Sequence, residues 1–461
     1  NVQLEFVLFP STDAKTKLNL MISGGDKLPD VLTFGVNATT AYEWGSEGVL
    51  VPLNDYFDNE GQYYRDLCAS FGFDADDLLK QITSVDGNIY GTPVYLPTYN
   101  NMSSPSRGWI NQDWLDAVGM TAPTTYDELD QVLRAFQTEL GLAEPLMATA
   151  GIVHTSNALC SGFDVNGGFS TFPMIAEPYY IVDGQVKYGI VEPGFKEYME
   201  MFSTYYKDGI ISSDFITKNT NPMEFTGTIS SGDVGVFFGE TNMVPNYIQM
   251  GEATDPNFEI APLPPITKEP GQTTHFATVK SPISGRVAAI SLSTAEVDLE
   301  KMGKYLDFFF TDEGALLSSM GVEGNDDGSY VFDENGDLQY SDYWNNYEGL
   351  TENEKPTLFI YSVMPMLKPK TPSSYSMDVQ FDCAPTWDTN ADSSYRMPDA
   401  ISLTADETTE YQAIYSDIQT LCMESIAKFI TGEKPLTDYD SFVESIRNAG
   451  IDDYLAIQQG A

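Results

Sequence analysis

The sequence has few of the residues that build zinc sites and nucleophilic centres. Its 461 residues include four cysteines and two histidines, His154 and His275. No two cysteines form a CxxC pair, so the ligand spacing of a structural zinc site is missing. A Ser/His or Cys/His nucleophile would have to use one of the two histidines, which we interpret as ordinary polar or interlobe residues. We therefore predict no metal, no cofactor and no catalytic residue. Disulfide pairing stays open among Cys68, Cys160, Cys383 and Cys422.

Positive charge and long apolar runs are also scarce. Lysine and arginine number 23 against 68 aspartates and glutamates, which gives a net charge of −45. Such a field repels phosphate backbones and anionic headgroups, so we exclude nucleic acid and the membrane surface as partners. No apolar stretch approaches the roughly 20 residues of a membrane-spanning helix.

Familiar catalytic motifs are absent as well. The sequence contains no GxSxG elbow, no GxxxxGK[ST] phosphate loop and no GxGxxG. Carboxylate pairs for glycoside hydrolysis can be drawn from 68 acidic residues almost at will, so their presence is uninformative. The stretch 324–338 is rich in oxygen donors but departs from EF-hand order, and Asn335-Gly336 favours a hairpin turn. Calcium binding there stays open.

The first half of the chain alternates between strand-like and helix-like patterns. This alternation favours an α/β lobe with a largely parallel sheet. The Asp86-Gly87 pair is typical of a tight turn. The patterns predict strands at 4–9 and 29–35, helices at 13–23, about 40–48 and 74–83, and a hairpin at 84–95.

A second series begins with a strand at 108–111 and two closely spaced helices. Thr125 and Glu128 fit a capping box at the start of the second helix, and Thr404 and Glu407 fit another. The region 150–190 has no secure assignment. Further patterns predict helices at 193–209, 298–321 (broken near Asp312) and 405–431, strands at 234–238 and 286–293, and an extended stretch at 258–266.

Aromatic, amide and charged residues follow several predicted strands. In open α/β sheets, ligands lie at the carboxyl ends of the strands. A flat ring can cover the C–H face of a sugar, while amides, carboxylates and arginine bind its hydroxyls. Each ring could equally be a packing residue. The ligand-binding candidates are Asn37, Tyr42, Trp44, Tyr95, Tyr99, Asn101, Arg107, Trp109, Glu240, Asn242, Trp387, Asp388, Tyr395 and Arg396.

Seven motifs in order resemble one family across nearly the whole chain. The chain is similar to extracellular solute-binding proteins (family 1, carbohydrate branch) of bacterial ABC importers, of the Gram-positive lipoprotein type. The motifs are SGGDKLPDVL (23–32), GVLVPLNDYF (48–57), VDGNIYGTP (85–93), NQDWLDAVGMTAPTTYDEL (111–129), ISSGDVGVFF (229–238), FTDEGALLSSMGVEG (310–324) and KFITGEKPLTDYDSFVESIRNAGIDDYL (428–455).

The resemblance implies an α/β, two-lobed periplasmic-binding-protein-like fold of type II, with hinge crossings and a helical C-terminal region. Lobe 1 would comprise 1–108 with 259–330 returning to it, and lobe 2 would comprise 109–258 with 331–461 mostly packing on it. It also implies ABC transporter permease partners, an extracellular monomer, and a membrane link only through a lipidated cysteine outside the printed chain.

The resulting hypothesis is a non-enzymatic subunit that captures a carbohydrate, with an oligosaccharide as the expected ligand, and delivers it to membrane permeases. A secreted glycoside hydrolase or lyase acting on polysaccharide is the alternative. A peptide or metal-chelate importer subunit would need a basic or Cys/His pocket, and the sequence shows none. Arg107 and Arg396 are the expected partners if the ligand carries a uronic acid. The sugar, its linkage, its length and its charge stay open.

Overall fold

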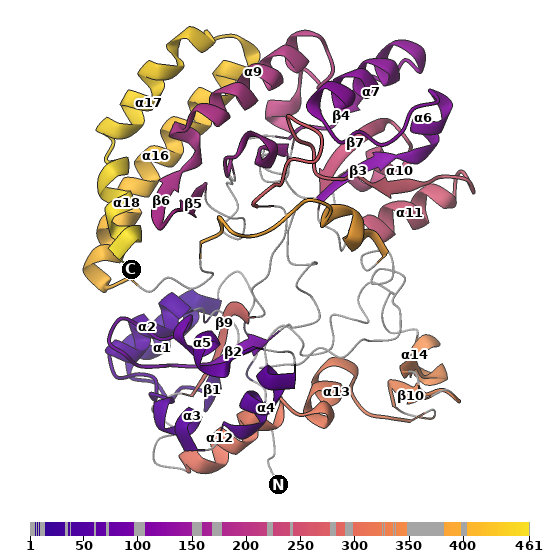
Figure 1. Ribbon diagram of the computed structural model, residues 1–461. Coiled ribbons are helices and arrows are strands. Elements are labelled where there is room, and N and C mark those ends of the chain that lie inside the picture. The colour runs from indigo at the N-terminus through magenta and orange to yellow at the C-terminus, as the bar shows by residue number, and fades with distance from the viewer. Residues whose placement is uncertain are drawn as a thin grey trace.

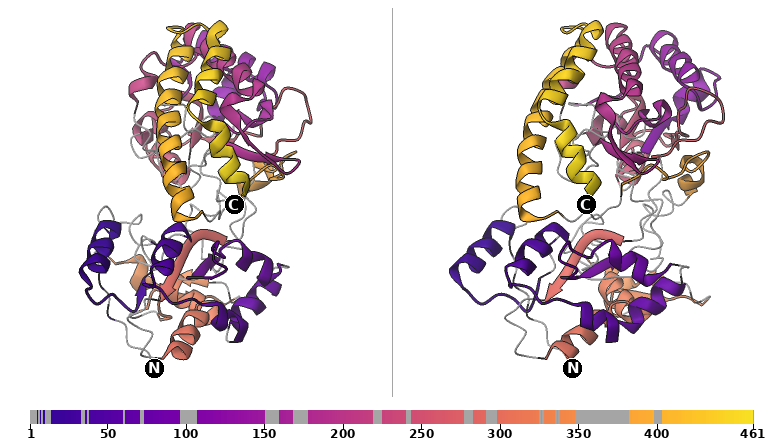
Figure 2. Two further views of the ribbon diagram at one scale, coloured as in Figure 1. Left: turned by 90° about the vertical axis from the view of Figure 1, so that its left-hand side faces the viewer. Right: turned by 60° about the vertical axis from the view of Figure 1, so that its left-hand side comes forward.

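The computed structural model forms two lobes, one above the other in Figure 1. The N-terminal helices lie in the lower lobe and the C-terminal helices lie in the upper lobe, and Figure 2 shows the same separation from two further directions. The chain crosses between the lobes more than once, because elements from its middle occur in both. The structure describes residues 5, 7, 9, 14–32, 36, 38–59, 61–70, 73–95, 107–149, 159–167, 178–218, 225–239, 243–276, 283–290, 298–324, 326, 328–334, 336, 338–347, 382–397 and 403–460.

A three-stranded sheet forms the centre of the lower lobe, in the order β1-β9-β2. The central strand, β9 (Ile283–Ile290), runs antiparallel to both β1 (Val31–Leu32) and β2 (Thr92–Tyr95). Because β9 comes from much later in the chain than its neighbours, the lower lobe is complete only when the chain returns to it.

Helices of the lower lobe enclose two hydrophobic clusters beside this sheet. One cluster contains Trp44 and Ala289, and the other contains Tyr64 and Phe310. Both clusters combine residues from the N-terminal part with residues after 288, so the returning segment is part of the core. The helices are α1 (Ala14–Gly24), α2 (Ala38–Ser46), α3 (Asn54–Asn59), α4 (Gln62–Ser70), α5 (Ala75–Lys80), α12 (Leu299–Phe308) and α13 (Asp312–Met320).

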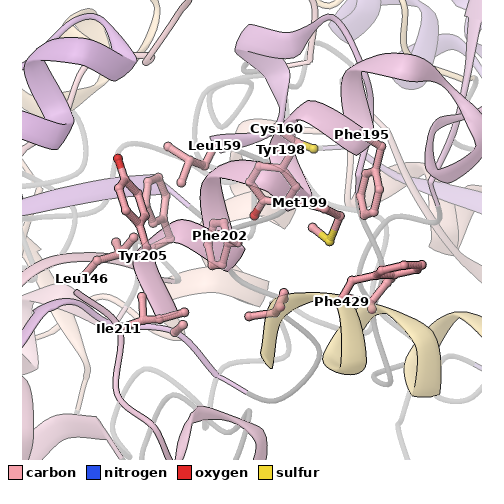
Figure 3. Packing of buried hydrophobic residues seen from close by; sticks show 14 of the residues in the cluster. Leu146, Leu159, Cys160, Phe195, Tyr198, Met199, Phe202, Tyr205, Ile211 and Phe429 are labelled. Carbon is pink, nitrogen blue, oxygen red and sulfur yellow. The ribbon is translucent and has the colours of Figure 1, made fainter. Parts of the chain in front are cut away.

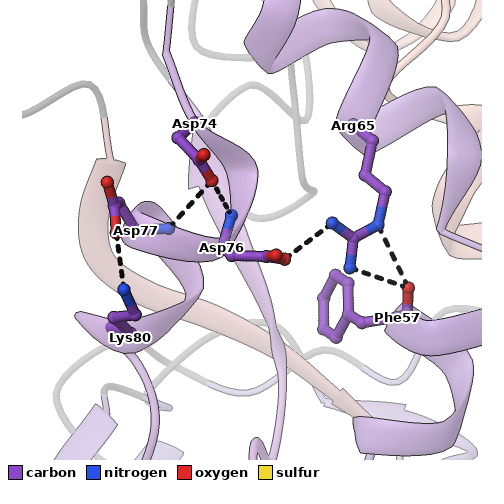
Figure 4. Close-up of polar contacts among 6 residues, drawn as sticks. All are labelled: Phe57, Arg65, Asp74, Asp76, Asp77 and Lys80. Carbon is purple, nitrogen blue, oxygen red and sulfur yellow. Dashed lines mark hydrogen bonds and ion pairs between the residues drawn. The ribbon is translucent and has the colours of Figure 1, made fainter.

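Polar contacts connect α3, α4 and α5 (Figure 4). Arg65 of α4 donates to the Phe57 carbonyl oxygen of α3 and forms a 2.6 Å ion pair with Asp76 of α5. Asp74 caps α5 by accepting from the N–H groups of Asp76 and Asp77. These contacts fix the packing of three short helices that would be marginal alone.

The predicted hairpin at 84–95 is wrong, although its turn is correct. Gly87 has a φ of +79° and donates its N–H to the Ser84 carbonyl oxygen, which gives the tight turn. However, β2 pairs with β9 rather than with the residues before the turn. The hairpin predicted near Gly336 is confirmed, because β10 (Tyr330–Phe332) pairs antiparallel with β11 (Leu338–Tyr340), just before α14 (Asp342–Asn345).

The upper lobe contains a four-stranded sheet in the order β4-β7-β3-β8. β3 (Arg107–Asn111) is antiparallel to β7 (Val234–Gly239) and to β8 (Ile260–Pro262), whereas β4 (Glu144–Leu146) is parallel to β7. The prediction of a largely parallel sheet is therefore wrong for the described strands. The physical reason is that β3 lies between β7 and β8 and runs opposite to both, so the helices that follow β3 do not return the chain to a parallel neighbour of β3.

Helices cover the upper sheet and form the largest hydrophobic cluster. Figure 3 shows Phe195, Tyr198, Met199 and Phe202 of α9 beside Phe429 of α16. The elements not yet bounded are α6 (Gln112–Ala117), α7 (Tyr126–Glu139), α9 (Pro193–Lys207), α10 (Thr226–Ser230), α11 (Val244–Glu252), α16 (Ala405–Thr431), α17 (Tyr439–Asn448), α18 (Ile451–Gly460), strands β5 (Tyr179–Val182) and β6 (Gln185–Tyr188), and 3₁₀ turns Ser161–Phe163, Gly189–Val191, Phe215–Thr217 and Leu436–Asp438.

Both predicted capping boxes are confirmed, at Thr125 and at Thr404. All four cysteines are buried free thiols. Residues 260–267 were expected to return to lobe 1, but β8 pairs with β3, and Thr267 donates its N–H to the Thr124 carbonyl oxygen. Residues 260–267 therefore pack with the upper lobe. The hairpin β10–β11 lies beside α13 of the lower lobe (Figure 1), although most of its residues belong to the range 331–461 that is expected to pack mostly on lobe 2. The division into lobes at fixed residue boundaries stays a prediction.

Candidate ligand-binding site

The ends of all four strands of the upper sheet meet along one side, which lies across the strand direction and is here called the edge of the sheet. Arg107, the first residue of β3, lies opposite Gly239, the last residue of β7. On the other side of β3, Leu263 follows β8 and donates its N–H to the Gly108 carbonyl oxygen at 2.8 Å. β4 runs parallel to β7, so the carboxyl ends of three strands meet the start of β3. This is the edge at which α/β sheets bind ligands.

The same edge is where the chain passes between the lobes. The chain arrives at Arg107 from β2 of the lower lobe, and after β8 it goes on to β9 of the lower lobe. From Phe276 to Ile283 there are seven residue steps, which span at most about 25 Å. Phe276 of the upper lobe therefore lies within about 25 Å of the start of β9 in the lower lobe.

A C-terminal segment, residues 382–397, packs against the edge. It begins as a short helix at 382–387 and is drawn in orange in Figure 1, on the side of the upper lobe that faces the lower lobe. Trp387 donates from Nε1 to the Gly108 carbonyl oxygen at 3.1 Å. Its ring meets the Trp109 ring edge-to-face, with centroids 4.7 Å apart, and the Arg107 guanidinium carbon lies 5.4 Å from its centroid.

Charge is concentrated at this contact. Arg107 is only 3% exposed, and burial lowers the pKa of its guanidinium to about 10, with Asp388 opposing and Arg396 adding to the shift. A pKa of about 10 leaves Arg107 protonated at neutral pH. The structure thus brings together three sequence-predicted polar residues, Arg107, Asp388 and Arg396, from positions almost 300 residues apart.

A second polar group lies further along the same segment. His275 Nδ1 is 2.9 Å from Asp392 Oδ1 and 3.0 Å from Ser394 Oγ, and Ser394 also donates to Asp392 Oδ1 at 2.7 Å. Burial raises the pKa of Asp392, but the hydrogen bonds from Ser394 and His275 outweigh it and hold the pKa below its ordinary value. In a Ser-His-Asp catalytic triad, serine and aspartate bind different ring nitrogens. Here both bind Nδ1, so this group lacks that geometry.

One aromatic ring packs on the histidine, and two further rings pack on that one. The His275 and Tyr395 rings are 4.1 Å apart at 33°, and Phe276 meets Tyr395 edge-to-face at 5.8 Å. The buried Tyr180 of β5 contacts Phe276 at 5.1 Å and Tyr395 at 6.4 Å. His275, Phe276 and Tyr395 are each half-buried.

The three tryptophans among the predicted site residues are core residues. Trp44, Trp109 and Trp387 are 3%, 0% and 2% exposed and belong to hydrophobic clusters. Trp44 donates from Nε1 to Asn19 Oδ1 at 3.1 Å inside the lower lobe. Protein side chains cover all three rings, so here they support the lobes and offer no face for a sugar. Sequence alone cannot separate these roles, because a tryptophan after a strand suits both.

The remaining predicted residues have different outcomes. Tyr42 of α2 is half-buried in the lower lobe beside the cluster that contains Trp44, and Tyr395 joins the aromatic group above. Tyr95 lies in β2, and its side chain is outside what the structure describes. The other predicted positions fall outside the described residues: Asn37, Tyr99, Asn101, Glu240 and Asn242.

Sequence reasoning named His275 only as a polar or interlobe residue and did not single out Phe276. The available signal was their place just after an extended, proline-rich crossing, combined with the rarity of histidine in the chain. Their partners, Asp392 and Ser394, carry no local signal, since the contact joins segments 117 and 119 residues apart.

Two further searches of the described residues gave no candidates. No group of three or more histidine, cysteine, aspartate or glutamate side chains in the described ranges is arranged to hold a metal ion. Among the helices that the structure describes, none combines the length and the apolar character needed to cross a bilayer.

Comparison with known proteins gives consistent matches. The fructooligosaccharide ABC transporter substrate-binding protein of Streptococcus pneumoniae serotype 4 is 22% identical over 97% of this chain and 82% of its own length. The solved structure of an extracellular solute-binding protein from Bifidobacterium longum subsp. infantis has a TM-score of 0.75 at 19% identity, covering 97% of this chain and 89% of that one. An alginate-binding protein has a TM-score of 0.70 at 21% identity, over 98% and 89%.

These structural matches confirm the two-lobed α/β fold of solute-binding proteins. The family model described as bacterial extracellular solute-binding protein matches residues 1–316, more than half of the sequence. The chain is therefore a member of the bacterial extracellular solute-binding protein family.

Proposed function

We propose that this chain is the substrate-binding subunit of an ABC importer that captures an oligosaccharide between its two lobes. The observation that carries the proposal is the edge of the upper sheet, where Arg107, Asp388 and Arg396 meet beside the interlobe crossings. Relatives named for fructooligosaccharide and alginate binding support a carbohydrate ligand.

The proposed mechanism is non-covalent. The half-buried Arg396 guanidinium donates hydrogen bonds to sugar oxygens or to a uronate carboxylate, and the half-buried Asp388 accepts from hydroxyls. The Arg107 guanidinium is buried, so it acts through its charge on Asp388 and not by direct contact with the sugar. Hinge motion at the crossings brings the lower lobe onto the ligand and removes water, which strengthens these hydrogen bonds. The sugar leaves chemically unchanged, so the protein acts as a carrier and not as an enzyme.

The proposed setting follows from the family. We place the protein outside the cell as a monomer, held at the membrane by a lipid anchor. Its partners are then the permease subunits of the transporter, which receive the sugar when the lobes open.

The test is a binding screen on the whole chain. A neutral fructooligosaccharide and an acidic alginate oligosaccharide represent the two ligand classes, with melting temperature as the first readout and calorimetry on the tighter binder. We expect at least one to raise the melting temperature and bind at one site per chain, and reducing-sugar release to stay at background. No stabilisation by either class, or a sugar recovered in fragments, would contradict the proposal.

Variants locate the site once a ligand is known. Arg396→Ala and Asp388→Asn should weaken binding by about ten- to a hundredfold, the cost of one or two charge-assisted hydrogen bonds. Arg447→Ala is the matched control, because Arg447 is exposed in the last turn of α17. Equal affinities in all three variants would place the ligand elsewhere.

A further inference from the structure

Exposed apolar side chains are concentrated in one small part of the lower lobe. This part comprises the end of α13, the hairpin β10–β11 and α14, and Figure 1 places the hairpin and α14 on the side of the lobe away from α1 and α2. A concentration of exposed apolar side chains is typical of a binding interface. Five of the thirteen large hydrophobic residues that are exposed in the described ranges lie here: Leu317, Val322, Phe332, Tyr343 and Tyr347.

The register of the hairpin gives it an apolar face. Tyr330 lies opposite Tyr340, and Phe332 lies opposite Leu338. Opposite and alternate residues of paired strands point to the same side of a sheet, so these four side chains share one face. Tyr330 is buried and meets the Phe332 ring edge-to-face, with centroids 5.8 Å apart, whereas Phe332 is 46% exposed and Leu338 and Tyr340 are half-exposed. A buried ring therefore supports an open apolar face.

Backbone hydrogen bonds attach this hairpin to the chain that follows α13. Ser329 donates its N–H to the Val322 carbonyl oxygen at 2.8 Å, and Gly324 donates to the Tyr330 carbonyl oxygen at 2.8 Å. Ser341, the N-cap of α14, donates its N–H to the Ser329 carbonyl oxygen at 3.1 Å. The hairpin and α14 are therefore fixed to each other and to the end of α13, so that docking of a partner costs little in ordering.

The charge along this part of the chain has one sign. Between Lys304 and Lys355 the sequence has 13 aspartates and glutamates and no lysine, arginine or histidine. Apolar rings bordered by carboxylates are complementary to a protein face on which lysine or arginine borders apolar side chains. Four of the acidic residues are exposed on the segment that carries the open rings: Glu323, Asp326, Glu334 and Asp342.

The same charge argues against two other occupants. A second copy of the chain would bring carboxylates against carboxylates, which costs free energy across an interface. An anionic lipid surface would bring phosphates against carboxylates and is repelled in the same way. The chemistry of the surface therefore favours a different protein that carries basic and apolar side chains together.

We propose that this part of the lower lobe docks a permease subunit of the importer, through a permease face of apolar side chains bordered by lysine or arginine. The inference rests on the proposed function and adds the place at which the chain meets its transporter partner. The candidate sugar site lies on the edge of the upper sheet, so docking and sugar binding are separable. The docking residues, here called the hairpin surface, are Phe332, Leu338, Tyr340, Tyr343 and Tyr347 with Glu323, Asp326, Glu334 and Asp342.

The first experiment measures binding to the permease subunits of the same transporter, reconstituted in phosphatidylcholine nanodiscs. The full chain is saturated with the tighter-binding of the two oligosaccharides named above. The double variant Phe332→Ala, Tyr343→Ala should bind the permease about tenfold or more weakly, because it loses two rings of the interface, and should keep wild-type affinity for the sugar. Leu20→Ala is the control, because Leu20 is an exposed apolar residue on α1, and it should bind the permease as wild type does.

A charge reversal tests the acidic border without removing a ring. Glu334→Lys should slow association with the permease by about three- to tenfold at low salt, and added salt should reduce the difference from wild type. Glu47→Lys is the matched control, because Glu47 is exposed just after α2 on the other side of the lobe. Its association rate should stay within about twofold of the wild-type rate.

Several outcomes would overturn the inference while sugar binding by the wild type leaves the carbohydrate function intact. They are wild-type affinity of the double variant for the permease, an equal loss in Leu20→Ala, no permease binding by the wild type, equal binding to empty nanodiscs, and self-association of the wild type in sedimentation that the double variant abolishes. Failure of both sugars to bind the wild type would instead remove the proposed function, and the inference with it.

Discussion

Trp387 donates a hydrogen bond to the Gly108 carbonyl oxygen across 279 residues of sequence. The same indole packs edge-to-face on Trp109. These two contacts connect the C-terminal segment 382–397 to the first residues of β3. This is the strand at which the chain enters the upper lobe. The position of the candidate site therefore depends on a contact between two distant parts of the chain.

Truncating this side chain should destabilise the upper lobe. Trp387→Ala removes a buried indole and leaves a cavity beside Trp109, which costs about 3–5 kcal/mol in the free energy of unfolding. Trp387→Phe should cost less, about 1–2 kcal/mol, because Gly108 keeps its hydrogen bond from Leu263. Urea denaturation measures both. Leu20→Ala, an exposed position on α1, should change the value by less than about 0.5 kcal/mol; a similar small change in Trp387→Ala would contradict the core assignment.

Two helical glycines should respond oppositely to alanine. A Cβ at Gly303 of α12 would lie 2.5 Å from Cδ2 of the buried Tyr56 ring, so Gly303→Ala should destabilise the lower lobe by about 1–3 kcal/mol. A Cβ at Gly227 of α10 meets no atom within 4 Å, so Gly227→Ala should be neutral or stabilising by up to about 1 kcal/mol. Thermal melting of the pair checks this. Equal shifts would mean that helix propensity alone decides both sites.

Asp307 should be important for the docking of α12 on α4. Its buried carboxylate accepts from the N–H groups of Tyr63 and Tyr64 at 3.3 and 3.2 Å, at the start of α4. Asp307→Ala leaves those donors without this acceptor and should cost about 1–3 kcal/mol in chemical denaturation. Asp58→Ala, at an exposed position of α3, is the control. If the two variants have the same free energy of unfolding in chemical denaturation, the contact contributes nothing to stability.

The capping box of Thr125 and Glu128 should make the free energy of unfolding depend on pH. Hydrogen bonds from Thr124 and Thr125 lower the pKa of Glu128 below its ordinary value of 4.5. The unfolded chain then binds more protons in this window, so the contribution is present above about pH 4.5 and is lost as pH falls through the folded pKa. Glu128→Gln should therefore flatten stability against pH between about pH 5.5 and 3 relative to wild type. Glu139→Gln, at the exposed end of the same helix, should keep the wild-type slope.

Local features of the fold could be predicted because neighbouring residues determine them. The capping boxes at Thr125 and Thr404, the turn at Gly87 and the long helix α16 each depend on side chains within a few positions. The ordered family motifs also predicted two lobes, since they span nearly the whole chain, and they predicted the family that the comparison confirms.

The direction and pairing of the strands could not be predicted in the same way. β2 looks like half of a local hairpin, yet it pairs with β9, which begins almost 190 residues later. Arg107, Asp388 and Arg396 could be named as candidates, but only the fold brings them to one edge.

By itself, the sequence determined helices such as α7 and α16, their capping boxes, the absence of familiar catalytic motifs and the family. Only the tertiary structure decided that Trp44, Trp109 and Trp387 are buried and that His275 and Tyr395 lie together in a half-buried pair. The physical reason is that burial depends on which distant segments pack on a side chain, whereas a cap or a turn is complete within its own few residues.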